Sequence, residues 1–272
     1  MKTTIPIFPK PIAALKLITT GVTVGPLVDS LHNQCLLEYD KAAIDIPSAG
    51  APFWSTLLSQ ASQASQAVDN DQMQYLIRTS WYIPPLLGIA YIVLGAILPR
   101  IMTLFLDNIK NNVGDGIANS STPSAPPVLR LRNKAILAVA STAFIIKLSE
   151  YLETSTVLNS SEINLSIMIT AAIAQWALLD ATLPALLTAI IVAIGGPLSE
   201  LPFVAGGYWH YIPSAADYFP LKDIDFGLLN NLLGGGYRDL ALSSITGPCY
   251  FAVTMDAIAL GRWFDAEEEG NE

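Results

Sequence analysis

The sequence predicts an all-α membrane protein, a bundle of six transmembrane helices with both termini in the cytosol. Three observations support this prediction. The 272-residue chain is 52% hydrophobic and only 14% charged, whereas an average soluble domain carries roughly 25% charged residues. Its apolar residues gather in stretches close to the ~20 residues that cross a bilayer. Its Lys and Arg residues concentrate in segments that would lie on one side of the membrane.

Six stretches are predicted to span the membrane, and they differ in clarity. Lys16 and Asp29 interrupt the first stretch, whereas the second is the most clearly apolar. Gly195-Gly196-Pro197 is predicted to break the fifth in mid-membrane, which is tolerated only where the backbone faces protein or a cavity. The six predicted spans are residues 11–31, 81–106, 134–152, 164–182, 184–205 and 243–264.

The basic residues of the loops determine the predicted orientation. Arg100 and four further basic residues lie in or beside the linker between the second and third spans. No Lys or Arg separates the third span from the fourth. By the positive-inside rule, this linker and both termini are predicted to be cytosolic. The four further residues are Lys110, Arg130, Arg132 and Lys134.

The chain divides into three predicted parts. Residues 1–80 hold the first transmembrane helix and a lumenal loop, residues 81–264 hold five helices, and residues 265–272 form an acidic cytosolic tail. A short polar helix is predicted within the lumenal loop 37–73. The tail is interpreted as a solvated charge run in preference to a partner-binding segment. The net charge of −9 argues against binding of nucleic acid.

An enzymatic function has little support in the sequence. The two histidines, His32 and His210, have no nucleophile motif beside them, and Gly-x-Ser-x-Gly, HExxH and P-loop motifs are absent. We interpret both histidines as hydrogen-bonding groups near the membrane surface. Cys35 and Cys249 form no CxxC or Cys/His cluster, so no zinc site is predicted. We therefore predict neither an enzyme nor a resident metal or cofactor.

Two features within the spans have both a structural and a ligand-related interpretation. Lys147 and Glu150 share one helix face and are predicted to form an ion pair. A purely structural pair is preferred over an anchor for a lipid headgroup, because charges inside a membrane must first be satisfied. The predicted break at Gly195-Gly196-Pro197 could open a pocket for a hydrophobic ligand, or it could be a packing kink without a ligand.

The carboxylates within the spans are predicted to face other helices. Gly21, Gly25 and Asp29 are spaced by four residues and are predicted to form one helix-packing stripe. Asp256 lies among small residues that permit close helix approach. A proton relay through Asp29, Asp180 and Asp256 would instead indicate a transporter, but paired broken helices in two repeated halves are missing.

Asp180 ends a long apolar run, and a second apolar run begins directly after it. A carboxylate at the junction of two apolar helices costs free energy unless it has a partner or reaches water. The predicted orientation places this junction at the cytosolic face, where water lowers the cost. We therefore interpret Asp180 as a surface point for a partner rather than as a proton carrier.

Several segments resemble the insulin-induced gene (Insig) family of endoplasmic reticulum membrane proteins. Residues 81–99, WYIPPLLGIAYIVLGAILP, resemble the family's second span, which opens with an aromatic-x-Pro-Pro motif and ends at a Pro. The other similar segments follow the family's order and spacing from the third span to the sixth. They are Lys147-Leu148, Asn164-Leu165-Ser166, Ala171-Ala172, Trp176, Asp180, Gly207-Tyr208-Trp209-His210-Tyr211, Asp217-Tyr218-Phe219, Pro248-Cys249 and Gly261-Arg262. The sixth span and an insertion at residues 222–242 depart from the family pattern.

The resemblance implies a regulator of sterol homeostasis that binds oxysterols or other lipids in a cavity between helices. Members retain the sterol regulatory element-binding protein cleavage-activating protein in the endoplasmic reticulum and promote degradation of HMG-CoA reductase. We therefore expect a multi-pass protein of that membrane, with a sterol or diacylglycerol-like ligand. The expected partners are polytopic membrane proteins such as a sterol-sensing-domain protein, bound through Asp180. The expected ligand-binding residues are Trp81, Pro85, Lys147, Trp176, Gly196 and Tyr208.

Two functions of other classes remain open beside this one. The chain could be a lipid-binding structural subunit of a larger membrane complex, with the fold kept and sterol regulation lost. A small-solute transporter that uses the intramembrane acids is the less favoured alternative. Competition by unlabelled sterol in photo-crosslinking would separate the regulator from the transporter, and purification from native membranes would separate it from the structural subunit.

Overall fold

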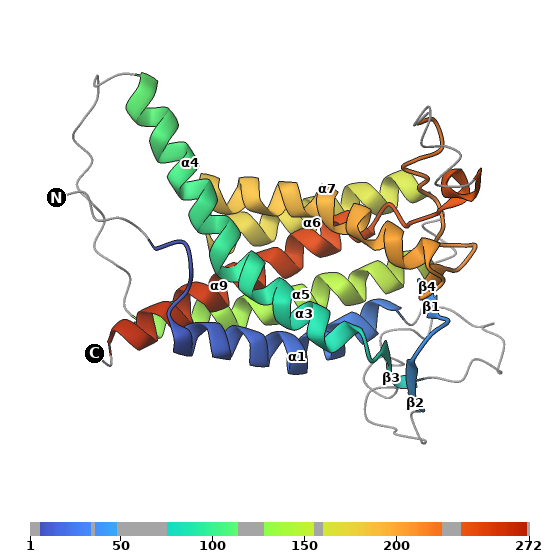
Figure 1. Cartoon of the computed structure of the whole chain (residues 1–272), viewed down its shortest axis with the longest axis horizontal. Helices are drawn as coiled ribbons and strands as arrows, with labels where there is room; N and C mark the ends of the chain where they lie inside the picture. The colour runs from blue at the N-terminus through green and yellow to red at the C-terminus, as the bar shows by residue number, and fades with distance from the viewer. Residues whose placement is uncertain are drawn as a thin grey trace.

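The computed structural model describes residues 6–33, 36–47, 75–113, 128–154, 160–224 and 235–270. Within these ranges the chain forms a bundle of long helices that run mostly along one axis (Figure 1). The α-helices are α1 (Pro11–Asn33), α3 (Ile83–Ile92), α4 (Leu98–Val113), α5 (Val128–Thr154), α6 (Ser161–Leu179), α7 (Leu183–Ala205) and α9 (Thr246–Glu269). A π-helix, η1 (Val93–Ile97), joins α3 to α4, and a 3-10 helix, η3 (Gly235–Asp239), precedes α9.

Five helical segments of the described chain are long and apolar enough to cross a membrane. They match the first five predicted spans closely, and the second runs without interruption through α3, η1 and most of α4. The five are Pro11–Leu31, Ile83–Ile109, Arg130–Thr154, Ser161–Leu179 and Leu183–Ala205. The sixth predicted segment forms α9, which is less apolar than these five.

The position of α9 explains why it is less apolar. This helix lies at the centre of the bundle (Figure 1) and contacts α1, α3, η1, α5, α6 and α7. A helix enclosed by protein needs no apolar surface toward lipid and can hold polar groups that its neighbours satisfy. Gly95 and Gly261 allow the closest contact, because a Cβ at Gly261 would lie 2.2 Å from the Gly95 carbonyl oxygen. Small residues at such crossings let two helix backbones approach.

The packing stripe predicted on α1 is confirmed. Gly21 and Gly25 face α3, where a Cβ at Gly21 would lie 2.4 Å from the carbonyl oxygen of Leu87. Asp29 continues the stripe and accepts a hydrogen bond from the Tyr39 hydroxyl at 3.0 Å. The stripe thus positions both a helix contact and a carboxylate at the end of α1.

Two small antiparallel sheets correct the all-α prediction. Strands β1 (Leu37–Tyr39) and β4 (Trp209–Tyr211) pair, with Leu37 opposite Tyr211, and strands β2 (Ala43–Pro47) and β3 (Tyr75–Ser80) form the second sheet. They lie at the end of the bundle opposite the N- and C-terminal ends of the chain (Figure 1), here called the strand end. Strands β1 and β2 form the start of loop 37–73, in which a short polar helix was predicted; the centre of that loop lies outside the described residues, so the helix stays a prediction.

The predicted break in the fifth span is wrong, because α7 continues as a helix through Gly195, Gly196 and Pro197. A proline removes the hydrogen bond to the carbonyl four residues earlier, which is that of Ala193. That carbonyl faces Gly247 of α9, where a Cβ would lie 2.9 Å from the oxygen. Close packing against α9 therefore holds the helix together across its proline.

The acidic segment at the C-terminal end is not a solvated tail in its described part. Residues 265–269 continue α9, and three of their four acids bind neighbouring helices. Asp265 pairs with Arg100 of α4, and Glu267 pairs with Lys16 of α1 at 2.8 Å. Glu268 accepts the backbone N–H of Ala13 at 2.8 Å, which caps the start of α1, since the first amides of a helix lack internal partners. These contacts fix the start of α1 beside the end of α9.

Candidate functional site

A largely apolar cavity of about 250 Å³ lies at the strand end of the bundle. Helices α1, α3, α5, α7 and α9 and strands β1 and β4 all contribute to its wall. Aromatic side chains form a large share of this wall: Tyr39, Tyr91, Phe203, Trp209, Tyr211 and Tyr250. Apolar cavities with a few converging polar groups are the usual form of small-molecule sites.

Glu200 of α7 is the central polar group of this cavity. Its side chain is buried, and its carboxyl accepts hydrogen bonds from Tyr211 at 2.7 Å and from Tyr250 at 2.9 Å. The Tyr211 hydroxyl also lies 3.2 Å from the Thr246 hydroxyl. A buried carboxyl is tolerated only when hydrogen bonds replace its lost hydration. Glu200 therefore joins α7, β4 and α9 around the cavity.

Asp29 brings a second carboxylate to the same wall through its bond with Tyr39. Burial and the nearby Asp29 charge raise the pKa of Tyr39 well above its ordinary value. Burial and the nearby Glu200 likewise raise the pKa of Tyr211. Both hydroxyls consequently stay protonated over the physiological range and donate their hydrogen bonds to carboxylates.

The three acids considered for a proton relay have separate partners. Asp29 binds Tyr39, whereas Asp256 is fully buried in the bundle and accepts a hydrogen bond of 3.3 Å from Tyr91. Asp180 lies in the turn between α6 and α7 and binds Arg262. As predicted, Asp29 and Asp256 face other elements of the protein.

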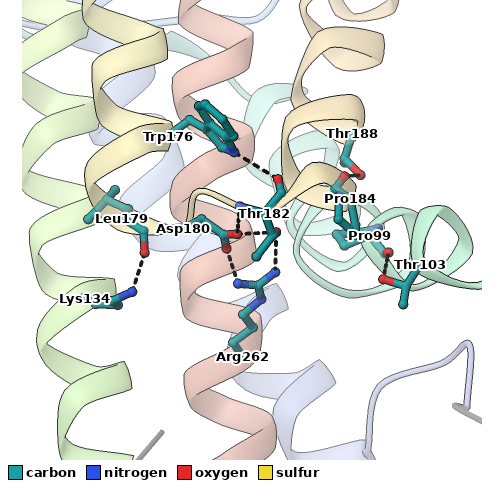
Figure 2. A network of polar contacts seen from close by, with 10 residues as sticks. All are labelled: Pro99, Thr103, Lys134, Trp176, Leu179, Asp180, Thr182, Pro184, Thr188 and Arg262. Atoms are coloured by element: carbon teal, nitrogen blue, oxygen red, sulfur yellow. Dashed lines mark hydrogen bonds and ion pairs between the residues drawn. The ribbon is translucent and has the colours of Figure 1, made fainter. Parts of the chain in front are cut away.

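Figure 2 shows Asp180 at the turn between α6 and α7, with Arg262 of α9 reaching its carboxylate. The same carboxylate accepts the backbone N–H of Thr182 at 3.0 Å and the Thr182 hydroxyl. Trp176 closes the turn from the other side, since its indole N–H donates to the Thr182 carbonyl at 3.0 Å. Lys134 of α5 donates to the Leu179 carbonyl at 2.7 Å. The turn is thus tied to both α5 and α9.

This geometry corrects the expected exposure of Asp180. Its side chain is only 5% exposed, and the carboxylate is occupied by Arg262 and Thr182. The negative end of the α6 dipole lies at this turn, so the Asp180 charge depends on the Arg262 guanidinium. Arg262, whose side chain is 41% exposed, is the part of the pair that solvent reaches.

The six expected ligand-binding residues lie outside the wall of the cavity. Trp81 and Pro85 are exposed at the start of α3, and the Tyr208 ring packs edge-on against Tyr82. Trp176 belongs to the Asp180 turn. Lys147 and Gly196 contact other residues of the protein. As ligand contacts, all six stay predictions.

Two of these residues have structural contacts, and for Lys147 this was the preferred interpretation. Lys147 forms the predicted ion pair with Glu150. Gly196 packs against Tyr250, and a Cβ there would lie 2.4 Å from the ring. His210, interpreted as a hydrogen-bonding residue, contacts the Asp40 carboxylate through Nδ1 at 2.9 Å. Cys249 is buried, whereas Cys35 lies outside the described residues.

The sequence analysis missed the residue at the centre of the cavity. Glu200 is the lone carboxylate within an otherwise apolar span, and such residues are functional-site hypotheses by default. Tyr211 and Tyr250 carry no comparable signal, because tyrosines are common near membrane interfaces. In the described ranges, no three His, Cys, Asp or Glu side chains lie close enough to hold a metal ion.

Comparison with known proteins concerns the fold. No family model matches the sequence, and no curated protein matches it. Among solved structures, a mycobacterial Insig homologue, MvINS from Mycobacterium vanbaalenii, matches over 93% of this chain and 94% of its own, with a TM-score of 0.54 and 18% identity. A cross-linked MvINS trimer matches over 94% and 95%, with a TM-score of 0.55 and 17% identity.

The chain has an Insig-like fold. The resemblance first detected in short sequence segments is therefore confirmed for the fold, over nearly the whole chain rather than residues 81–264 alone. An Insig-like fold with five helices that are apolar enough to cross a bilayer is that of a multi-pass membrane protein.

Proposed function

We propose that this Insig-like protein is a non-enzymatic regulator that binds a lipid or sterol in the cavity beside Glu200. In this proposal the bound lipid controls how tightly the protein binds another membrane protein, such as a sterol-sensing-domain protein, in the endoplasmic reticulum membrane. The observation that carries the proposal is an apolar, aromatic cavity whose wall is shared by five helices and two strands. A ligand in such a cavity touches every element at once.

In this proposal the protein has two helix arrangements, and the ligand binds one of them more tightly than the other. The difference between the two affinities sets how far the ligand can shift the equilibrium. Helices α7 and α9 offer a route for the coupling. Both line the cavity, at Glu200 and Tyr250, and both reach the Asp180 turn, where α7 begins and α9 carries Arg262. A lipid that shifts α7 against α9 would therefore change the Asp180–Arg262 pair, near which we place the partner.

The membrane arrangement in this proposal has six spans and cytosolic termini. Helix α9 supplies the sixth span, shielded from lipid by its neighbours. Asp180 lies at the end of the bundle opposite the strand end. The Lys and Arg residues gathered there support a cytosolic location for that end. The cavity then lies toward the lumenal side.

The proposal is tested by photo-crosslinking with sterol and diacylglycerol probes, followed by mapping of the labelled peptides. We expect labelling of the cavity wall that excess unlabelled lipid removes. An Ala90→Phe variant should fill the cavity and abolish this labelling, because Ala90 lines the wall. Ala177→Phe, on the exposed face of α6, is the matched control and should change nothing. Labelling that is unchanged both by excess unlabelled lipid and by Ala90→Phe would overturn the proposal.

The regulatory part needs a second measurement. Affinity purification from native membranes, with and without added lipid, should recover a sterol-pathway membrane protein in a lipid-dependent amount. Recovery of a stoichiometric assembly without such a protein would support a structural subunit instead. Lipid-independent recovery would contradict regulation by the cavity.

A further inference from the structure

We propose that the cavity selects a lipid with a protonated amine at its polar end. This inference rests on the proposed function, since it names the ligand class of the same cavity. Asp29 and Glu200 contribute two carboxylates, whereas the residues that line the cavity in the described chain include no Lys, Arg or His. A fatty carboxylate or a phosphate headgroup would be repelled by charge of its own sign on these two residues.

Glu200 has acceptor capacity that the protein leaves unused. A carboxylate offers about four lone-pair positions, and the two tyrosine hydroxyls at 2.7 and 2.9 Å fill two of them. Neither donor carries a positive charge, and within the described residues Glu200 forms no ion pair. A cation that also donates hydrogen bonds strongly favours the ionised form of a carboxyl in apolar surroundings. A ligand ammonium group supplies both.

The aromatic wall supports the same ligand chemistry. Trp209 stacks on Phe203 with ring centroids 4.8 Å apart, and Tyr39 meets Trp209 edge-on at 6.1 Å. Together with Tyr211 and Tyr250, these rings line the same cavity as the two carboxylates. Aromatic rings bind organic cations through the negative face of the ring. A cavity lined by both carboxylates and aromatic rings therefore suits an ammonium group better than a neutral headgroup.

The remaining wall requires the rest of the ligand to be apolar. Val28, Ile83, Leu86, Leu87 and Val253 line the cavity away from the carboxylates. They would pack against a hydrocarbon chain or ring system.

The test uses chain-matched photoreactive probes in nanodiscs of neutral phosphatidylcholine: a tetradecyl amine, its N-acetyl amide, the alcohol and the carboxylic acid. The wild-type protein should be labelled at the cavity by the amine about tenfold more efficiently than by the amide or the alcohol, since a charge-assisted bond is that much stronger. The acid should label least. Equal or weaker labelling by the amine would overturn the inference while leaving lipid binding intact.

Variants test whether the preference for the amine probe depends on the charge of Glu200. Glu200→Gln removes the charge but can keep both tyrosines hydrogen-bonded, one donating to the amide oxygen and the other accepting from the amide N–H. Amine labelling should therefore fall to the level of the alcohol. Glu162→Gln, at an exposed position on α6, is the matched control and should keep the preference. Equal loss of all probes in a folded Glu200→Gln protein would reduce Glu200 to a structural role and overturn the inference. Failure of every probe to label the wild-type cavity would overturn the proposed function as well.

Discussion

Arg262 of α9 binds the carboxylate of Asp180 in the turn between α6 and α7, across 82 positions of sequence. This pair joins the end of the central helix to the start of α7, and α7 leads to the cavity. The nearly buried side chain of the pair is Asp180, and the more exposed one is Arg262. Any partner that binds here must therefore meet Arg262 first, with Asp180 holding it in place.

Asp180→Ala should lower the stability of the protein as well as its capture of a partner. The change leaves the Arg262 charge without its partner and removes the acceptor of the Thr182 amide. We expect a loss of roughly 2 kcal/mol, between the values for exposed and buried ion pairs. Thermal unfolding in detergent and affinity capture from membranes would measure the two effects.

A charge exchange separates structure from recognition. The double variant Asp180→Arg, Arg262→Asp should recover much of the stability, since the pair is restored in reverse. Capture of the partner should stay weak, because position 262 then carries a negative charge where the partner binds the positive charge of Arg262. Glu269→Ala, at the exposed end of α9, is the control and should leave both measurements unchanged. If Asp180→Ala kept the full stability of the protein and its full capture of the partner, the Asp180–Arg262 pair would have no role in partner binding.

Ala181→Gly should stabilise the protein by about 1 kcal/mol. Ala181 follows the last turn of α6 and adopts a φ of 55°, a conformation that favours glycine. Glycine removes the contact between Cβ and the backbone that this conformation imposes. Ala177→Gly within α6 is the matched control and should destabilise by a similar amount. A lower unfolding temperature for Ala181→Gly would show that this turn carries no strain.

The neighbouring glycines of α7 provide a matched pair of tests. A Cβ at Gly196 would lie 2.4 Å from the Tyr250 ring, whereas a Cβ at Gly195 would meet no described atom within 4 Å. Gly196→Ala should cost about 1–3 kcal/mol by overpacking and should move Tyr250 away from Glu200. Gly195→Ala should be neutral or stabilising by up to ~1 kcal/mol. Equal unfolding temperatures for the two variants would contradict the α7–α9 packing.

The helices were predictable from the sequence because each carries its own pattern of apolar residues. Contacts between distant segments were not. Residues 37–39 pair with residues 209–211 in β1 and β4, and each stretch is too short for its alternation of apolar and polar residues to predict a strand. Glu200 and Asp180 were both visible as carboxylates beside apolar runs, but their partners Tyr250 and Arg262 lie on α9. Only the folded bundle shows which acid faces a cavity and which closes a turn.

Single cysteines should place the start of α1 and the end of α9 on the same side of the membrane. Lys16 pairs with Glu267, and the Ala13 amide donates to Glu268, so these helix ends lie together. In a background of Cys35→Ser and Cys249→Ser, Lys10→Cys and Glu269→Cys should react equally with a membrane-impermeant maleimide. Asp40→Cys, at the strand end, should react from the opposite side.

The comparison of these three positions also decides whether α9 crosses the membrane. Six spans require an even number of crossings between residues 10 and 269, whereas five spans would place them on opposite sides. Helix α9 runs along the other helices from the strand end to the end where the C-terminus lies (Figure 1), so we expect the even number. Labelling of Glu269→Cys from the same side as Asp40→Cys would contradict the six-span arrangement, with the five apolar helices as the complete set of spans.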